Sequence, residues 1–219
     1  MKVLSYIETP FPEKFGVPRQ SLLVEAQGII RFPKDDFYTE AFRGIEGFSH
    51  LWLIFDFHLV GEGFQGALVR PPRFDGKKKL GVFATRTPHR PNRIGLSVVK
   101  FEKLEITSGE VILQVSGVDL VDKTPIYDIK PYIPYADSHP EAKALDYHEA
   151  PEKLSVRWIK SPDNLSLHEK NLIEQVIGLD PRPGQDKVSD AEYGVSLLGW
   201  NFRFKKELDI FLITDFVKE

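Results

Sequence analysis

The clearest pattern in the chain is the run HLWLIFDFH at residues 50–58, in which apolar side chains occupy every second position. Alternation with a period of two is typical of a β-strand, whose successive side chains point to opposite faces. One face, which carries Leu51, Leu53, Phe55 and Phe57, is predicted to be core. The other face mixes aromatic, acidic and imidazole groups, which is typical either of a strand that lines a ligand cavity or of the wet face of an antiparallel sheet.

Further runs rich in Val, Ile, Phe and Tyr predict more strands. A short turn at residues 108–110 separates two of them at hairpin distance. Helical periodicity is scarce before about residue 135, and neither a GxGxxG motif after a strand nor a P-loop is present, which disfavours a Rossmann domain. We therefore expect a mainly β protein with a compact antiparallel β-barrel over residues 1–140. The runs are LLVEAQGIIRF (22–32), LGVFATR (80–86), IGLSVVKFEKLEIT (94–107), EVILQVSGVDLV (110–121) and PIYDIKPYI (125–133).

A second, smaller unit is expected at residues 141–219. The polar and helix-breaking stretch that begins at Pro134 is typical of a linker. Ser166 and Glu169 then form an S-x-x-E capping box, and apolar residues recur at helical spacing until Gly178, which is expected to cap the helix end. The runs YGVSLLGWNFRF and LDIFLITDFV predict a terminal strand pair. The second unit is therefore predicted to be a small α+β domain.

Composition narrows the possible chemistry. The chain has 219 residues and no cysteine, so it can bury a core but cannot form a disulfide or a thiolate metal site, and this fits a cytoplasmic location. No apolar run reaches about 18 residues, so no membrane partner is expected. On an extended strand His50 and His58 would lie roughly 26 Å apart. Only Asp56 and His58 could share an ion, and without an HxH or HExxH motif we expect no metal site.

Charge is unevenly distributed along the chain. The net charge is −3, yet residues 70–100 hold nine basic side chains against the single acid Asp75. Such a block is the expected footprint of a phosphate-binding surface. Pro88 and Pro91 fix the backbone between arginines, whose planar guanidinium groups suit phosphates and bases. For Lys77, Lys78 and Lys79, a solvated loop explains the charge equally well.

Aspartates gather in a second cluster at residues 118–138. Asp119, Asp122 and Asp128 alternate with apolar positions there. Aspartates near strand ends can hold a ribose hydroxyl, orient an amine or accept a proton. They also cap turns, and for any one of them alone that interpretation is at least as strong.

Several segments together resemble the TsaA-like family, whose bacterial members are the TrmO-type tRNA methyltransferases. The resemblance runs in order over about residues 5–140, and DPRP (180–183) with YGVSLLGWNFRF resembles the family's small C-terminal domain. The segments are EKFGVPRQ (13–20), RGIEGFSHLWLIFDFH (43–58), RPPR (70–73), GVFATRTPHRPNRIGLS (81–97) and VDLVDKTPIYDIKPY (118–132).

The resemblance implies a β-barrel homodimer that binds S-adenosylmethionine and methylates N6 of threonylcarbamoyladenosine at tRNA position 37, beside the anticodon. The implied partner is tRNA and not DNA. Cofactor contacts carried over by motif are Pro18, Arg19, Gln20, Phe57, His58, Arg86, Leu96, Asp122, Lys123, Thr124 and Pro125.

Asp122 is the expected proton acceptor, with Tyr127 and Asp128 behind it. The expected RNA contacts are Arg70, Arg73, Lys77, Lys78, Lys79, Arg90 and Arg93, assisted by Arg203, Lys205 and Lys206. Two other functions stay open on the residues alone. One is a non-catalytic RNA-binding barrel, and the other is a metal-assisted hydrolase that uses Asp56 and His58.

Overall fold

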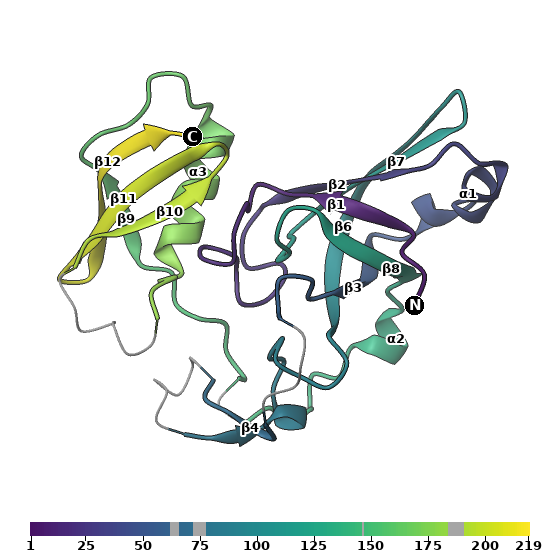
Figure 1. The fold of residues 1–219 in the computed structure, drawn as a ribbon, viewed down its shortest axis with the longest axis horizontal. Coiled ribbons are helices and arrows are strands. Elements are labelled where there is room, and N and C mark those ends of the chain that lie inside the picture. The colour runs from purple at the N-terminus through teal and green to yellow at the C-terminus, as the bar shows by residue number, and fades with distance from the viewer. Residues whose placement is uncertain (62–65, 72–77, 146, 184–190) are drawn as a thin grey trace.

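A closed barrel of antiparallel strands forms the N-terminal part of the protein. The computed structural model describes residues 1–61, 66–71, 78–145, 147–183 and 191–219. Within these ranges the barrel order is β1-β2-β7-β6-β3-β8, and each neighbouring pair is antiparallel (Figure 1). The predicted mainly β architecture is therefore confirmed. The strands are β1 (Ser5–Glu8), β2 (Gln27–Phe32), β3 (His50–Asp56), β6 (Ile94–Thr107), β7 (Glu110–Ser116) and β8 (Thr124–Pro131).

The alternation at residues 50–58 becomes strand β3. Leu51 and Leu53 are fully buried and Phe55 is 4% exposed, so this face lies inside the barrel. Trp52, Ile54 and Asp56 alternate with them and are partly exposed. The polar and aromatic face of β3 is therefore on the outside of the barrel.

Antiparallel pairing brings three connections to the same end of the barrel. The chain leaves β1, β3 and β7 and enters β2, β6 and β8 at this end, as the registers Glu8↔Ile29, Asp56↔Ile94 and Ile7↔Thr124 show. The connections are residues 9–26, the described parts of 57–93, and residues 117–123. We call this end of the molecule the loop end.

The predicted strand at residues 80–86 is wrong. Only its first two residues are extended, as β5 (Leu80–Gly81), which pairs with β4 (Leu68–Val69) in a two-stranded ribbon. The chain then turns into the 3₁₀ helix η3 (Val82–Ala84). The turn is stabilised because Val82 is buried and both the amide and the hydroxyl of Thr85 donate to its carbonyl. Other short helices in this half are α1 (Asp36–Ala41), η1 (Ile45–Gly47) and α2 (Pro134–Asp137).

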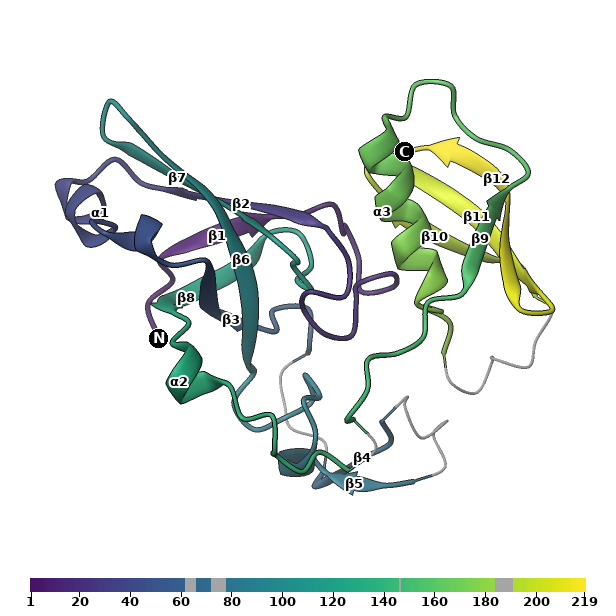
Figure 2. The same cartoon turned by 180° about the vertical axis from the view of Figure 1, so that it is seen from behind.

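The C-terminal part is a four-stranded sheet with one helix. The order is β10-β11-β12-β9, in which only the β12–β9 pair is parallel. The predicted strand pair was incomplete, because the run at residues 193–204 turns at Leu198 and Gly199, both with positive φ, and so forms two strands. Helix α3 lies on the side of the sheet that faces the barrel (Figures 1 and 2). The elements are β9 (Ser155–Trp158), α3 (Leu167–Gly178), β10 (Tyr193–Leu197), β11 (Trp200–Glu207) and β12 (Ile210–Lys218).

Helix α3 begins as predicted and ends slightly later. The Ser166 hydroxyl accepts the Glu169 amide and the Glu169 carboxylate accepts the Ser166 amide, which completes the capping box. Gly178 is the last helical residue and not the cap, a role taken by Leu179. A Cβ on Gly178 would lie 2.7 Å from the Leu154 carbonyl oxygen, so glycine is required here for close packing. Among the described residues, no helix is long and apolar enough to cross a membrane.

Candidate active site at the loop end of the barrel

Two of the expected cofactor segments meet directly at the loop end. Arg86, just after η3, donates from Nη1 to the Gln20 Oε1 at 2.6 Å. The two residues are distant in the sequence, and only the barrel topology brings their loops together. Arg86 itself is exposed, so the rest of its guanidinium group is available to a ligand. Pro18 is buried and Arg19 is exposed beside them.

A partly buried carboxylate lies next to this contact. Asp119 accepts hydrogen bonds from the Ser97 side chain and the Ser21 backbone, and its charge interacts with Arg86. Its Oδ1 is buried and has no hydrogen-bond partner among the described residues. Burial raises the pKa of Asp119 to about 6, and hydrogen bonds from the Ser97 side chain and from the Asp119 and Ser21 backbones, together with the charge of Arg86, only partly oppose this shift. A carboxylate in this state suits a ligand that brings its own donor or positive charge.

The aspartate cluster predicted from the sequence included Asp119, but no catalytic or cofactor-binding role was predicted for this residue. The deciding signal was available in its neighbours, because Val118 and Leu120 are both buried and hold the aspartate in an apolar turn. Its partner Ser97 on β6 is only 5% exposed. The alternation of buried and exposed residues along β6 puts Ser97 on the inward face, so the sequence pattern could have indicated its position. The sequence pattern alone did not rank Asp119 above its neighbour Asp122.

A third expected segment, Phe57–His58, meets the fourth, residues 122–125. His58 Nδ1 lies 3.4 Å from the Thr124 hydroxyl, which in turn donates to the Val121 carbonyl at 2.6 Å. Thr124 is 3% exposed, so this contact lies at the edge of the barrel interior. The Phe57 amide donates to the Arg93 carbonyl, which ties the end of β3 to the entry of β6. All four segments therefore belong to the loop end.

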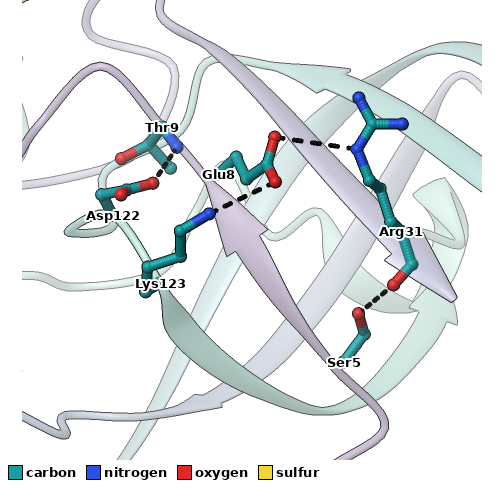
Figure 3. Close-up of polar contacts among 6 residues, drawn as sticks. All are labelled: Ser5, Glu8, Thr9, Arg31, Asp122 and Lys123. Carbon is teal, nitrogen blue, oxygen red and sulfur yellow. Dashed lines mark hydrogen bonds and ion pairs between the residues drawn. The ribbon is translucent and has the colours of Figure 1, made fainter.

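Asp122, the expected proton acceptor, helps to hold two connections together. Its Oδ1 accepts the Thr9 amide at 2.9 Å (Figure 3). Its own amide donates to the Phe11 carbonyl at 2.7 Å. Lys123 has a φ of 60° and forms an exposed ion pair with Glu8 at 3.2 Å. The turn between β7 and β8 is thus fastened to the end of β1. The catalytic role of Asp122 stays a prediction.

Tyr127 and Asp128 lie on the outside of the barrel, apart from the Arg86–Asp119 group. Tyr127 lines a pocket of about 330 Å³ together with Asp56 and Arg93, which form an ion pair at 3.5 Å. Burial, and then the charge and hydrogen bonding of Asp56, raise the pKa of Tyr127, so its phenol stays protonated and acts as a donor. Asp128 pairs on the surface with Lys130 at 3.2 Å.

The basic residues fall into two groups. Arg70, Lys78 and Lys79 are exposed next to the β4–β5 ribbon. Arg90 and Arg93 are partly buried and bond to backbone carbonyls, Arg90 to Thr85 at 3.4 Å and Arg93 to Val60 at 2.8 Å. Two further residues of the expected RNA surface, Arg73 and Lys77, lie outside the described residues.

Leu96 faces away from the barrel interior and is 52% exposed. Ile54 on β3 is its partner in register, and Ile94, two residues earlier on the same face of β6, is 38% exposed. These three residues form an apolar stripe on the outer barrel surface. The expected contact between Leu96 and the cofactor therefore requires a ligand that reaches outside the barrel.

Both parts of the chain match one protein family. Residues 6–138 match the tRNA-methyltransferase O N-terminal domain, and residues 149–219 match the TrmO C-terminal domain. The chain belongs to the tRNA-methyltransferase O family. The barrel lies in the first of these domains, and the four-stranded sheet with α3 lies in the second.

Similar family members cover almost the whole chain. A tRNA (adenine(37)-N6)-methyltransferase from Escherichia coli is 39% identical over 213 residues, which are 92% of this chain and 91% of that protein. A putative S-adenosylmethionine-dependent methyltransferase, RcsF from Pseudomonas aeruginosa, is 42% identical and covers 89% of this chain and 87% of its own. A crystal structure of TrmO from Pseudomonas aeruginosa superposes with a TM-score of 0.78 at 35% identity, covering 100% of this chain and 97% of that one.

Proposed function

We propose that this family member transfers a methyl group from S-adenosylmethionine to N6 of threonylcarbamoyladenosine at tRNA position 37. The coarser activity, S-adenosylmethionine-dependent N6-methylation of adenosine 37 in tRNA, follows from family membership and from the names of the two full-length relatives. The threonylcarbamoyl group on the substrate rests on the resemblance of the sequence motifs. It is therefore the part of the proposal that most needs an experiment.

The observation that carries the proposal is the convergence of four segments at the loop end. Pro18–Gln20 meets Arg86 through the 2.6 Å hydrogen bond, and Phe57–His58 meets residues 122–125 through the His58–Thr124 contact. These segments, widely separated in the chain, thus meet in pairs at the same end of the barrel. An RNA-binding barrel without catalytic function would need the basic surface but not this convergence.

The polar groups at the loop end fit S-adenosylmethionine. This molecule carries an α-carboxylate and an α-ammonium group. Arg86 offers a guanidinium fork of the kind that binds carboxylates, and the buried Asp119 Oδ1 is an acceptor that lacks a donor among the described residues. We assign Arg86 and Asp119 to these two groups, and the loop that carries Pro18–Gln20 to the wall beside them.

Methyl transfer to N6 requires alignment of the reacting groups more than activation of either one. When bound, S-adenosylmethionine would supply a methyl group on a positively charged sulfur, whose carbon–sulfur bond would break as the carbon–nitrogen bond forms and N6 gives up its proton. Holding the acceptor nitrogen in line with the methyl group supplies most of the rate enhancement. We propose Asp122 as the proton acceptor. Tyr127 lies with Asp56 on the outside of the barrel, apart from Arg86 and Asp119, so we assign it no part in this transfer.

The tRNA would approach along the exposed basic residues. We propose that the exposed Arg70, Lys78 and Lys79 contact phosphates, and that Arg203, exposed on β11 of the C-terminal domain, assists them. Arg90 and Arg93 already bond within the protein, so their share in RNA binding is proposed to be smaller. Phosphate contacts of this kind weaken as salt concentration rises.

We also propose that the protein is a cytoplasmic homodimer in which the apolar stripe of Ile54, Ile94 and Leu96 contacts a second copy. Exposed apolar side chains on a sheet face are stabilised when another surface covers them. Such a contact would place Leu96 near a cofactor that extends beyond the barrel. Leu96→Glu should shift the protein toward the monomer in light scattering after size exclusion, and an unchanged mass would contradict this assignment.

The central test measures binding and then product. Isothermal titration of the purified protein with S-adenosylmethionine should show saturable binding. The protein is then incubated with threonylcarbamoylated tRNA and with the same tRNA lacking the modification, and nucleosides are analysed by mass spectrometry. A gain of one methyl group only in the first sample supports the proposal. Equal methylation of both tRNAs would contradict the substrate, and absent cofactor binding would favour a non-catalytic RNA-binding protein.

A further inference from the structure

The connection between β1 and β2 is held from two sides. On the barrel side, the Leu22 amide donates to the Gly117 carbonyl at 2.8 Å and Gln20 accepts from Arg86. On the other side, the same connection contacts the C-terminal domain along residues 10–25. The purple loop that projects from the barrel toward α3 in Figures 1 and 2 is part of this connection. Because the connection carries Pro18–Gln20, its position determines part of the proposed cofactor site.

Apolar contacts fasten the tip of the connection to the C-terminal sheet. The ring of Phe15 stacks on Tyr193 and on Phe204, with centroids 6.5 Å apart in each pair. Phe204 is fully buried in the core of the C-terminal domain. The barrel connection therefore contributes a side chain to the hydrophobic core of the other domain.

Gly16 is a point of tight packing between the two domains. Its φ is +89°, and a Cβ at this position would lie 2.5 Å from Cγ2 of Val195 on β10. Val195 is fully buried and β-branched, so it has little freedom to move away. The docked arrangement thus leaves no room for any side chain at residue 16.

Polar contacts extend the docking along the connection. The Glu25 amide donates to Oε1 of Gln175 on α3 at 2.8 Å, and Arg19 donates to the carbonyl of Arg182 at 3.4 Å. Arg182 is 1% exposed and held by two hydrogen bonds to Asp180, so this carbonyl belongs to a rigid part of the C-terminal domain. Arg19, one of the expected cofactor contacts, is therefore positioned by the domain that does not contain it.

We propose that the C-terminal domain is a positioning element of the cofactor site. It holds residues 10–25 against the loop end, so that Pro18–Gln20 is already ordered before the cofactor binds. Ordering a loop in advance removes an entropic cost from binding. This inference rests on the proposed function, because it concerns the affinity for S-adenosylmethionine.

The test compares two glycine substitutions in the full-length protein by isothermal titration with S-adenosylmethionine. Gly16→Ala strains a left-handed backbone and pushes against Val195, whereas Gly44→Ala strains a similar backbone, with φ of +85°, and its new Cβ meets nothing within 4 Å. We expect the dissociation constant to rise about tenfold for Gly16→Ala and to change less than about twofold for Gly44→Ala. Adding Val195→Ala to Gly16→Ala removes the clash and should recover most of the lost affinity.

Circular dichroism and thermal unfolding establish that each variant is folded. If Gly16→Ala does not fold, Gln175→Ala tests the same contact from the surface of α3 and should weaken cofactor binding about threefold. Affinities of Gly16→Ala or Gln175→Ala equal to that of the unaltered protein would overturn the inference alone. Absence of cofactor binding by the unaltered protein would instead overturn the proposed function, and the inference with it.

Discussion

Each of the two domains contains a charged side chain with buried polar atoms, and the two domains satisfy these atoms differently. In the C-terminal domain, Arg182 forms hydrogen bonds of 2.8 and 3.0 Å to Asp180 and lies over the rings of Phe211 and Tyr193. At the loop end of the barrel, Asp119 keeps one buried oxygen without a partner among the described residues and has a raised pKa. A charge that is fully paired serves the fold, whereas one that is partly paired is typical of a site completed by a ligand.

The largest expected effect on stability follows from removing the paired charge of Arg182. Arg182→Ala would leave Asp180 without its guanidinium partner and would open space beside Tyr193 and Phe211. Breaking a buried ion pair in this way should lower the free energy of unfolding by about 3–5 kcal/mol. Urea unfolding followed by circular dichroism measures it. A loss below about 1 kcal/mol would show that Arg182 is not needed by the fold, and the contrast with Asp119 would fail.

The next largest effect on stability follows from removing the partly paired charge of Asp119, and it depends on pH. Because folding raises the pKa of Asp119 to about 6, the folded protein binds this proton more tightly than the unfolded chain does. The resulting stabilisation is complete below about pH 4 and is lost as pH rises through about 6. Asp119→Asn should therefore gain about 3 kcal/mol relative to the unaltered protein between pH 4 and pH 7.

Urea unfolding at several pH values measures the difference between these two proteins. A difference that stays constant from pH 4 to pH 7 would mean that Asp119 is as well satisfied as Arg182. The asymmetry between the two domains would then disappear.

A smaller effect separates cofactor binding from RNA binding. Arg86→Ala removes the donor to Gln20 and the positive charge beside Asp119, so it should weaken S-adenosylmethionine binding about tenfold and raise the pKa of Asp119 further. Lys79→Ala removes one exposed charge and should mainly reduce the salt dependence of tRNA binding, with the slope falling by about one. Calorimetry and filter binding at several salt concentrations provide the two measurements. Equal effects of both substitutions on both ligands would refute this division.

The smallest expected effect is the loss of an exposed polar contact, the cap at the start of α3. Ser166→Ala removes the hydroxyl that caps α3, which should cost about 1 kcal/mol of unfolding free energy. Ser166→Asp is the matched control, because aspartate also accepts the amide hydrogen bond and suits a helix N-terminus. Thermal unfolding of both variants measures the effect. A larger loss than for Arg182→Ala would reverse the ranking of buried over exposed polar groups.

The fold was predictable wherever local periodicity determined it. The run at residues 94–107 became β6 with the predicted bounds, and the capping box predicted the start of α3 at Leu167. The strand predicted at residues 80–86 was wrong, because its apolar content reflected Val82 packing inward from a 3₁₀ turn. Strand β9 was not predicted. It pairs in parallel with β12, and parallel strands are not joined by a tight turn whose sequence could reveal the pair.

The candidate site was predictable by segment but less so by residue. The motif segments that contain Gln20, Arg86 and Thr124 do gather at the loop end. Asp119 lies between two apolar residues, whereas Asp122 is followed by Lys123, but this difference in neighbours does not reveal which distant groups each aspartate meets. Their roles differ because Ser97 and Ser21 surround one of them, and Thr9 contacts the other.

The sequence by itself determined strands β2, β3, β6, β7 and β8, the inward face of β3, the start of α3 and the position of the basic block, because each depends on neighbours within a few residues. Only the tertiary structure decided that the Asp119 Oδ1 is buried without a partner among the described residues, that Leu96 faces outward, and that the C-terminal domain contacts Phe15, Gly16 and Arg19. These properties depend on which distant segments the closed barrel and the docked sheet bring together. Burial and hydrogen-bond partners are set by that packing, and local sequence does not encode them separately.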